Sequence, residues 1–194
     1  LSLVGSEMCI RDRNTDPVFR NLNLSLKAGR IYGITGDNGM GKSTFIRLIA
    51  GLCMPDSGNI YIDDIEIKKY NVEYLRKHIG YLLQKPLLLR GKNPIDNIDT
   101  KRMMRYFNMG KKRYLEENVK GLSGGESQKL ALAYLLSDKT KDIYILDEPT
   151  AALDALAEDR MYREFENMIH GKTAVFISHR LGSTRFCDKI AMFE

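Results

Sequence analysis

A glycine-rich stretch near residue 40 has the residue types that bind phosphate. Glycines let the main chain wrap closely around an anion, so that successive N–H groups point inward. The lysine that follows them, Lys42, is placed to reach the β- and γ-phosphates of a nucleotide, and the Ser43 hydroxyl to bind magnesium. The stretch therefore predicts a nucleotide-binding loop. Its members are Gly36, Asp37, Asn38, Gly39, Met40, Gly41, Lys42, Ser43 and Thr44.

Two adjacent carboxylates, Asp147 and Glu148, follow a short apolar run at residues 143–146. A carboxylate at the tip of a buried strand, beside a phosphate loop, can hold the magnesium ion, and we assign this role to Asp147. Glu148 points elsewhere and can orient and polarise an attacking water molecule. A polar turn before Pro149 would have the same composition, so the pair is informative only together with the phosphate loop. In that combination it predicts nucleotide hydrolysis.

A second stretch suited to anions is the run Ser123, Gly124, Gly125 and Glu126, which precedes a helical pattern at residues 127–136. A serine and two glycines ahead of a helix favour an N-terminus whose N–H groups face an anion. One nucleotide needs only one phosphate loop. This second stretch therefore implies either two nucleotides or a second chain.

The elements that must position these residues follow a strand–loop–helix order, which predicts an α/β fold. Helical patterns cover residues 42–50 and 155–169, and a short one begins at Gly182. Four short runs rich in Ile, Tyr and Val have the pattern of a mainly parallel sheet that is buried on both faces. They lie at residues 31–35, 79–83, 143–146 and 174–177, and a further strand is expected at 190–193.

Two further regions differ in pattern from this core. Residues 21–26 and 59–65 alternate apolar and polar side chains, which is typical of a half-exposed antiparallel sheet. Residues 85–139 are charged, rich in Met and Leu, and mostly helical by pattern. We therefore expect residues 14–84 and 140–194 to form the α/β core, with 85–139 inserted as a helical subdomain.

The order of these motifs resembles the ATP-binding-cassette family, the nucleotide-binding domains of ABC transporters. The family signature LSGG[EQ] matches residues 122–126, and the resemblance extends from about residue 16 to residue 194. Gln84 lies 42 positions after Lys42, where the family has its Q-loop glutamine. His179 resembles the H-switch histidine, and residues 148–154 resemble the Walker B exit and D-loop. The resemblance implies a P-loop NTPase core with a small antiparallel β-subdomain and an inserted helical subdomain.

The resemblance also implies a mechanism with ATP and Mg²⁺ as ligands. Two copies would sandwich two ATP molecules head to tail, with Ser123 and Gly125 of one copy touching the γ-phosphate held by Lys42 of the other. Glu148 would act as the base, and His179 would help to hold the γ-phosphate and the attacking water. Gln84 would sense and ligate magnesium and carry the change into the helical subdomain.

The residues around His179 and the single helical segment at 155–169 resemble exporters of peptides, lantibiotics or drugs. An ATPase of this kind would work at the cytoplasmic face of the cell membrane, joined to or docked on a transmembrane domain. The alternative is a soluble cassette that acts on nucleic acid or ribosomes. Repair- and chromosome-type cassettes are excluded, because only 80 positions separate Lys42 from Leu122 and leave no room for a long coiled coil.

A basic segment at residues 101–120 keeps the alternative open. It has seven basic and two acidic residues, while the whole chain has a net charge of +5. Such a segment can meet nucleic acid, anionic lipid or an acidic protein, or it can be a solvated helix face. The remaining composition is that of an ordinary globular protein, with 43% hydrophobic and 28% charged residues and no apolar run near the roughly 20 that span a membrane. The three cysteines lack CxxC spacing, which argues against a disulfide framework or a zinc site.

The N-terminus departs from the family pattern. Cassettes usually stack an aromatic residue on adenine about 25 positions before the lysine, but that position falls near Pro17 and no aromatic residue precedes Val18. Phe19 fits better as an apolar position of the following strand. Residues 2–13 resemble translated sequencing-adapter DNA, so we expect residues 1–13 to be non-native and the first strand of the antiparallel sheet to be missing. The alternative is a native but irregular N-terminus. We also expect the chain to be a fragment, and a truncated product that cannot fold or dimerise is a third hypothesis.

Overall fold

The centre of the protein is a parallel sheet of five strands. The computed structural model describes residues 2–9, 18–19, 22–85, 123–151 and 153–193. The strand order is β6-β7-β8-β3-β9, and every pairing in this sheet is parallel. The expected strands are all present, with bounds that shift by one or two residues. They are β3 (Ile31–Gly36), β6 (Ile79–Leu82), β7 (Ile143–Asp147), β8 (Thr173–Ile177) and β9 (Lys189–Phe193).

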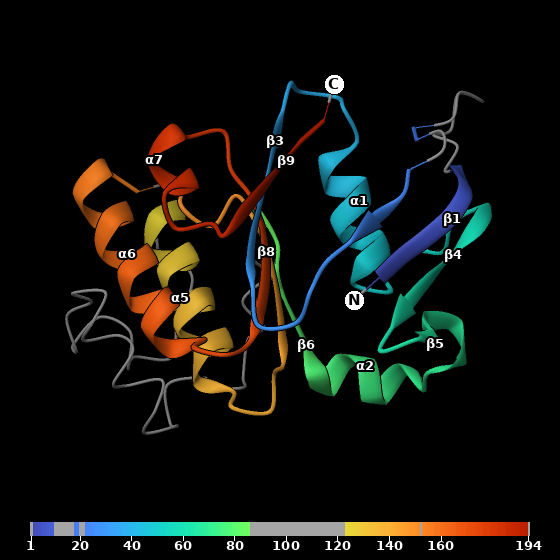
Figure 1. Ribbon diagram of the computed structural model, residues 1–194. Coiled ribbons are helices and arrows are strands. Elements are labelled where there is room, and N and C mark those ends of the chain that lie inside the picture. The colour runs from blue at the N-terminus through green and yellow to red at the C-terminus, as the bar shows by residue number, and fades with distance from the viewer. Residues whose placement is uncertain (1, 10–17, 20–21, 86–122, 152, 194) are drawn as a thin grey trace.

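Helices cover both faces of this sheet (Figure 1). On one face lies α1 (Lys42–Ile49); on the other lie α5 (Gly124–Ser137), α6 (Ala155–Met168) and α7 (Leu181–Thr184). Successive residues of each strand belong to two separate apolar clusters, because their side chains point to opposite faces of the sheet. Ile145 and Val175 pack with α1, whereas Tyr144 and Phe176 pack with α5 and α6. The continuous apolar runs in the sequence follow from this burial on both faces.

A smaller antiparallel sheet of four strands lies beside α1, in the order β2-β1-β4-β5. No strand was expected before residue 14, but β1 (Ser2–Cys9) pairs with β2 (Leu24–Ser25) and with β4 (Ser57–Ile62). The register of β1 against β4 shifts between Val4 and Cys9. Ladder hydrogen bonds join main-chain groups, so a segment without clean alternation can still complete a sheet. That residues 1–13 are non-native, and that the native first strand is therefore missing, stays a prediction.

The two expected antiparallel strands are shorter than their sequence patterns. Of residues 22–26, only β2 is strand, and the pattern at 59–65 is divided between β4 and β5 (Ile65–Glu66). The division falls at Asp63 and Asp64, whose φ angles of 49° and 62° form a tight turn. Asp tolerates this left-handed conformation better than most residues, because its short side chain can hydrogen-bond locally.

A short helix that the sequence patterns did not predict, α2 (Val72–His78), leads directly into β6. A 3₁₀ turn, η1 (Ile67–Lys69), precedes it, and Asn71 caps it by accepting a 2.8 Å hydrogen bond from the Glu73 N–H. Seven residues give too few turns for a recognisable apolar stripe. Only Leu75 of this helix is buried.

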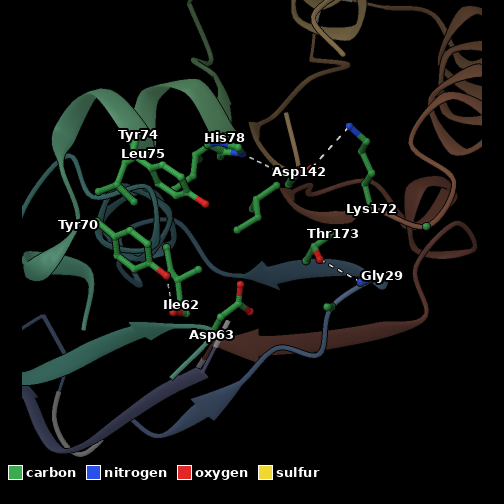
Figure 2. A pocket seen from close by; sticks show the side chains of 14 residues that line it. Gly29, Ile62, Asp63, Tyr70, Tyr74, Leu75, His78, Asp142, Lys172 and Thr173 are labelled. Atoms are coloured by element: carbon green, nitrogen blue, oxygen red, sulfur yellow. Dashed lines mark hydrogen bonds and ion pairs between the residues drawn. The ribbon is translucent and has the colours of Figure 1, made fainter. Parts of the chain in front are cut away.

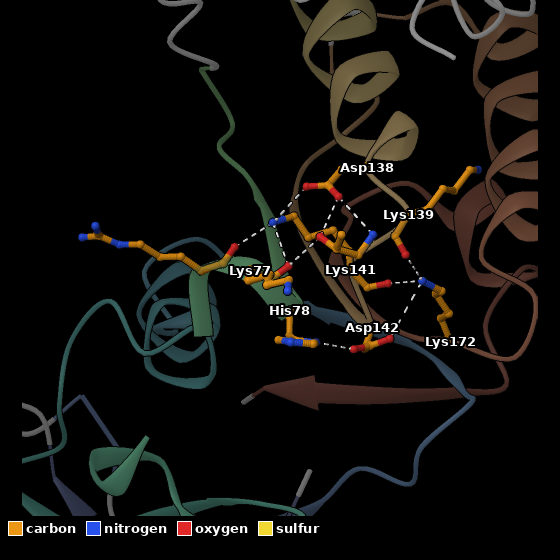
Figure 3. A network of polar contacts seen from close by, with 9 residues as sticks. Lys77, His78, Asp138, Lys139, Lys141, Asp142 and Lys172 are labelled. Carbon is orange, nitrogen blue, oxygen red and sulfur yellow. Dashed lines mark hydrogen bonds and ion pairs between the residues drawn. The ribbon is translucent and has the colours of Figure 1, made fainter. Parts of the chain in front are cut away.

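A polar network ties the end of α2 to the start of β7 (Figure 3). The Lys141 ammonium donates to the main-chain oxygens of Arg76 and Lys77 at 2.7 and 3.0 Å, which satisfies carbonyls at the end of the helix. Asp142 accepts a 2.6 Å contact from the His78 ring and lies 3.9 Å from the Lys172 ammonium. These contacts fix the amino ends of neighbouring parallel strands.

A cavity of about 200 Å³ lies at the same end of the sheet (Figure 2). Its walls include Tyr70, Tyr74 and His78 on one side and Thr173 at the start of β8 on the other. Open parallel sheets bind their ligands at the carboxyl ends of the strands. This cavity is therefore at the opposite end from the expected nucleotide site.

Of the expected helical subdomain, residues 86–122 lie outside the described residues, and these include the whole basic segment at 101–120. The remainder includes α5, which packs against the core sheet through Leu132, Leu135 and Leu136. None of the helices in the described ranges combines the length and the apolarity needed to cross a membrane.

Candidate nucleotide site

The phosphate loop connects the end of β3 to the start of α1. Gly36 has a φ of 141°, and a Cβ there would lie 2.3 Å from the Phe193 carbonyl oxygen. Gly41 has a φ of 77°, and a Cβ there would lie 2.4 Å from the nearest carbon of Val18. Both positions thus require glycine for their backbone conformation and for close approach. Asp37, Asn38, Gly39 and Met40 are exposed at the tip, and Thr44 is half-buried in the first turn of α1.

Lys42 extends its side chain back over the loop. Its ammonium donates hydrogen bonds to the main-chain oxygens of Gly36 at 2.8 Å and Asp37 at 2.6 Å, and the residue is only 6% exposed. The first turn of α1 has no acidic residue and no side-chain cap. The positive end of the helix and the lysine charge therefore converge on one small volume, which suits a polyanion such as a nucleotide phosphate.

Two oxygen donors suited to magnesium meet beside the loop. The Ser43 hydroxyl, at the start of α1, is hydrogen-bonded to the carboxylate of Asp147, the last residue of β7. Burial raises the pKa of Asp147 and Glu148 adds to the rise, while Ser43, Arg47 and Lys42 oppose it. A buried carboxylate of this kind is stabilised in its charged form by a nearby cation.

The donor set fits magnesium bound together with phosphate. No group of three or more His, Cys, Asp or Glu residues that could hold a metal by itself occurs in the described part of the chain. Mg²⁺ is usually held by one or two protein oxygens together with substrate phosphates and water. Ser43 and Asp147 supply two such oxygens next to the loop.

Glu148 lies between two polar side chains from neighbouring strands. The amide nitrogen of Gln84 donates a 2.7 Å hydrogen bond to its Oε2, and the Nε2 of His179 lies 3.0 Å from its Oε1. Gln84 follows β6, Glu148 follows β7 and His179 follows β8, and these three strands are neighbours in the sheet. The carboxyl ends of parallel strands thus bring the three predicted catalytic residues together, although they are far apart in sequence.

The main chain of Glu148 is held in an unusual conformation. Its φ is 47°, a left-handed value that costs a non-glycine residue about 1–3 kcal/mol. Its N–H donates to the Ile177 oxygen at 3.2 Å, and its own oxygen accepts from the Gln128 amide at 2.6 Å. Buried Gln128 was not among the predicted site residues. The sequence could have indicated its burial, because the helical spacing places Gln128 on the same face as the apolar residues Leu132 and Leu135.

The signature turn begins α5. Ser123 accepts from the Glu126 N–H at 3.3 Å, and the Glu126 carboxylate accepts from the Ser123 N–H at 2.8 Å and from its hydroxyl at 2.9 Å. This reciprocal arrangement is a capping box, so Glu126 satisfies the helix end in this chain. Gly124 is exposed, half-buried Gly125 follows it, and a Cβ on Gly124 would meet open space. The helices that follow the loop at Lys42 and the turn at Ser123 lie on opposite faces of the sheet (Figure 1).

Phe19 belongs to the core and does not present a free ring. It is 9% exposed and packs edge-on against Phe45 and Phe193, with ring centroids 6.5 and 5.6 Å away. This placement agrees with its assignment to an apolar position. An adenine-stacking role would require a ring face that this packing covers.

The sequence matches known transporter proteins over nearly its whole length. It is 34% identical over 203 aligned positions to ABC transporter B family member 29, chloroplastic, of Arabidopsis thaliana, covering 94% of this chain and 32% of that protein. It is 32% identical to the alpha-hemolysin translocation ATP-binding protein HlyB of Escherichia coli, covering 91% of this chain and 27% of that protein. P-glycoprotein 14 of Caenorhabditis elegans is also 32% identical, over 94% of this chain and 15% of its own length. The chain thus spans a third or less of these relatives.

The fold matches solved cassettes equally broadly. A dimeric structure of the ATP-binding cassette MJ0796 in a post-hydrolysis state, bound to ADP and Pi, superposes with a TM-score of 0.83. That alignment covers 100% of this chain and 94% of the other at 25% identity. The sequence model of the family described as ABC transporter matches residues 19–151, which include the loop at Lys42, the turn at Ser123 and Glu148. With its phosphate loop and carboxylates placed as described, this chain belongs to the ABC transporter family and has the fold of its ATP-binding cassette.

Proposed function

We propose that this chain binds ATP with magnesium and hydrolyses it to drive transport. The proposal rests mainly on the position of Glu148, which lies between Gln84 and His179. Glu148 directly follows Asp147, whose carboxylate is hydrogen-bonded to Ser43. A carboxylate held from both sides keeps a fixed direction, which a general base requires. Its side chain is 22% exposed, so water can reach it.

The proposed reaction is attack of a water oxygen on the γ-phosphorus of ATP. The bond between that phosphorus and the β–γ bridging oxygen breaks, and Glu148 takes the proton from the attacking water. Lys42 and the N–H groups of the loop bind the β- and γ-phosphates and stabilise the charge that develops there. Ser43, Asp147 and Gln84 would hold magnesium, which would supply additional charge neutralisation. His179 would position the γ-phosphate and the water.

A second cassette, arranged head to tail, completes the proposed site. Ser123 and Gly125 sit at the start of a helix on the far face of the sheet from α1, so a second copy is the simplest way to bring this turn to the nucleotide at Lys42. Solved cassettes that share this fold are dimeric, which supports the presence of a second copy. Loss of the γ-phosphate would then remove the bridge between the copies and open the dimer.

We infer that the transported substrate is exported and is peptide- or drug-like. The relatives described above are transporters, among them an alpha-hemolysin translocation protein and a P-glycoprotein. Because this chain spans only part of their length, the proposed partner is a transmembrane domain at the cytoplasmic face of the membrane. These relatives give no support to the alternative of a soluble cassette acting on nucleic acid.

The variant Glu148→Gln tests the proposal. It keeps the hydrogen-bonding shape but cannot accept the proton, so hydrolysis should fall by at least about 100-fold while ATP binding persists. Glu166→Gln, an exposed change on α6, is the matched control. Phosphate release and nucleotide titration measure the two quantities. Normal turnover by Glu148→Gln would remove Glu148 from the proposed role.

The same variant tests the dimer. Bound ATP that is not hydrolysed should hold two copies together in size-exclusion chromatography with light scattering. Adding Ser123→Arg to Glu148→Gln should return the protein to monomers, because the larger side chain occupies the space next to the γ-phosphate. An ATP-dependent dimer that survives Ser123→Arg would contradict the head-to-tail arrangement.

A further inference from the structure

Arg180, the residue after His179, connects three parts of the site. One guanidinium nitrogen donates to a carboxylate oxygen of Glu158 on α6 at 2.7 Å and to the main-chain oxygen of Leu153 at 2.9 Å. The other terminal nitrogen lies 3.4 Å from the main-chain oxygen of Ala151. A single planar side chain therefore holds both the helix and the turn that leads from Glu148 into it.

Glu158 is a buried carboxylate whose two oxygens both have partners. Oε2 accepts from Arg180, and Oε1 accepts a 2.9 Å hydrogen bond from the Thr150 hydroxyl. Glu158 is 7% exposed and Thr150 2%, so little water reaches the carboxylate itself, although the Arg180 side chain is 41% exposed. Removing one partner of a buried charge leaves the other uncompensated, which is costly. The arrangement of Arg180, Glu158 and Thr150 is thus fixed as a unit.

This unit flanks the proposed catalytic contact on both sides. Thr150 is two residues after Glu148, and Arg180 is one residue after His179; the Glu148 carboxylate and the His179 ring are 3.0 Å apart. The main chain of Arg180 is anchored as well. Its N–H donates to the Ser178 hydroxyl at 3.1 Å, and its oxygen accepts from the Ser183 hydroxyl at 2.6 Å. The guanidinium therefore joins two segments that each carry one of the reacting side chains.

We propose that Arg180 is a positioning residue for hydrolysis. With Glu158 as its anchor, it clamps the turn containing Ala151 and Leu153 against the segment that carries His179, and so keeps His179 and Glu148 in register. Arg180 makes no contact with substrate in this role. The inference rests on the proposed function of Glu148. A misplacement of about 1 Å in catalytic geometry can cost about 100-fold in rate without altering ground-state binding.

A nearby arginine provides a matched control. Arg185 on the segment after α7 pairs with Asp159, the neighbour of Glu158 on α6, and its guanidinium lies 4.9 Å from the centre of the Phe186 ring. It joins the same two regions of the fold through an exposed ion pair. Within the described residues, Arg185 makes no hydrogen bond to the turn at Ala151 and Leu153, in contrast to Arg180.

The experiment compares Arg180→Gln, Arg180→Lys and Arg185→Gln by steady-state ATP hydrolysis, nucleotide titration and thermal unfolding. Arg180→Gln should lower kcat about 10- to 100-fold, with KM and ATP affinity within about twofold of the parent. Arg180→Lys should recover only part of the rate, because one ammonium cannot reproduce the planar fork of donors. Arg185→Gln should keep the parent kcat.

Three results would overturn the inference. They are a parent kcat in folded Arg180→Gln, an equal loss of kcat in Arg185→Gln, and a loss of ATP affinity in parallel with kcat. If Arg180→Gln does not fold, a parent kcat in Arg180→Lys is the overturning result. Glu148→Gln, assayed alongside, separates the positioning role of Arg180 from the proposed role of Glu148. If Glu148→Gln abolishes turnover while Arg180→Gln leaves turnover unchanged, only the role of Arg180 fails.

Discussion

The side-chain amide of Gln84 donates a 2.7 Å hydrogen bond to the carboxylate of Glu148, 64 positions away in the sequence. Gln84 follows β6 and is close to the start of the expected helical subdomain, whereas Glu148 is the proposed base. The bond therefore connects the proposed hydrolysis site to the residue that leads into the expected helical subdomain. If a change at the γ-phosphate displaces Glu148, the hydrogen bond would transmit that displacement directly to Gln84.

We expect Gln84→Ala to lower turnover about 10- to 100-fold while ATP binding changes little. The substitution removes the donor that fixes one oxygen of Glu148, and the carboxylate then samples unproductive directions. Steady-state hydrolysis and nucleotide titration measure the two effects. Leu83→Ala, at the neighbouring exposed position, is the control. Equal losses in both variants would mean that the end of β6, and not the Gln84 amide, is responsible.

We expect Asp147→Asn to raise stability and to lower hydrolysis. Burial raises the pKa of Asp147, so its charged form is disfavoured in the folded state at neutral pH. The parent therefore loses stability as pH rises from the unfolded pKa through the raised folded value, and a neutral amide avoids this loss. Magnesium-dependent turnover should fall at least about 10-fold, because a weaker oxygen donor replaces the carboxylate.

Urea unfolding at pH 7 without nucleotide and ATP turnover with magnesium check the two halves of this prediction. An Asp147→Asn protein that is less stable than the parent would show that the hydrogen bond from Ser43 and the attraction to the Lys42 charge outweigh the burial of the carboxylate. Parent-like turnover would instead remove Asp147 from the proposed magnesium site.

We expect Gly41→Ala to destabilise the protein more than Gly39→Ala. Both glycines have positive φ angles, 77° and 89°, so both substitutions add backbone strain. A Cβ at Gly41 would also lie 2.4 Å from Val18 and 2.6 Å from Phe19, whereas one at Gly39 would meet nothing within 4 Å. The difference between the two variants should be about 1–3 kcal/mol, the range for overpacking a close contact. Denaturant unfolding without nucleotide measures this difference in the free energy of unfolding. Equal losses of stability in the two variants would mean that backbone strain alone causes the destabilisation.

We expect the stability lost in Asp188→Asn to depend on pH. The main-chain N–H of Ile31, at 2.7 Å, and then the Arg30 guanidinium, at 2.9 Å, hold the pKa of Asp188 below its usual value. Its contribution is therefore fully present above the unfolded pKa and is lost as pH falls through the lowered folded value. The pair is largely exposed, so the loss at pH 7 should be below about 1 kcal/mol.

Urea unfolding of the parent and Asp188→Asn at pH 7, 5, 4 and 3 tests this expectation. The difference should be constant down to about pH 5 and should shrink below about pH 4, near the unfolded pKa of an aspartate. Glu166→Gln should differ little from the parent over the same range. A difference that grows on acidification would reverse the sign of the proposed linkage.

Local patterns were sufficient to predict the phosphate loop and the core strands. The loop from Gly36 to Thr44 is contiguous, and its chemistry depends on glycines and a lysine at fixed spacing. Strands of a parallel sheet that is buried on both faces are apolar throughout, so their runs were recognisable without knowledge of their neighbours. Gln84, Glu148 and His179 were expected to share a site, and the ends of β6, β7 and β8 bring them together.

Other features needed contacts that no local pattern encodes. Strand β1 was not expected, because its main-chain pairing with β4 does not depend on alternating side chains. Glu158 was overlooked as well, although its position on the buried stripe with Met161, Tyr162 and Phe165 would have revealed a charged residue inside the protein. Its partners Thr150 and Arg180 could not have been identified in that way.

The sequence by itself determined which residues are of the types that can surround a phosphate, hold magnesium and accept a proton, and in which α/β framework they lie. Only the tertiary structure decided how those residues are held, with Glu148 between Gln84 and His179 and with Arg180 anchored by Glu158. The physical reason is the separation along the chain over which each property is set. Residue type and backbone conformation are set over a few positions, whereas these contacts join segments that meet only when parallel strands align and helices pack against them.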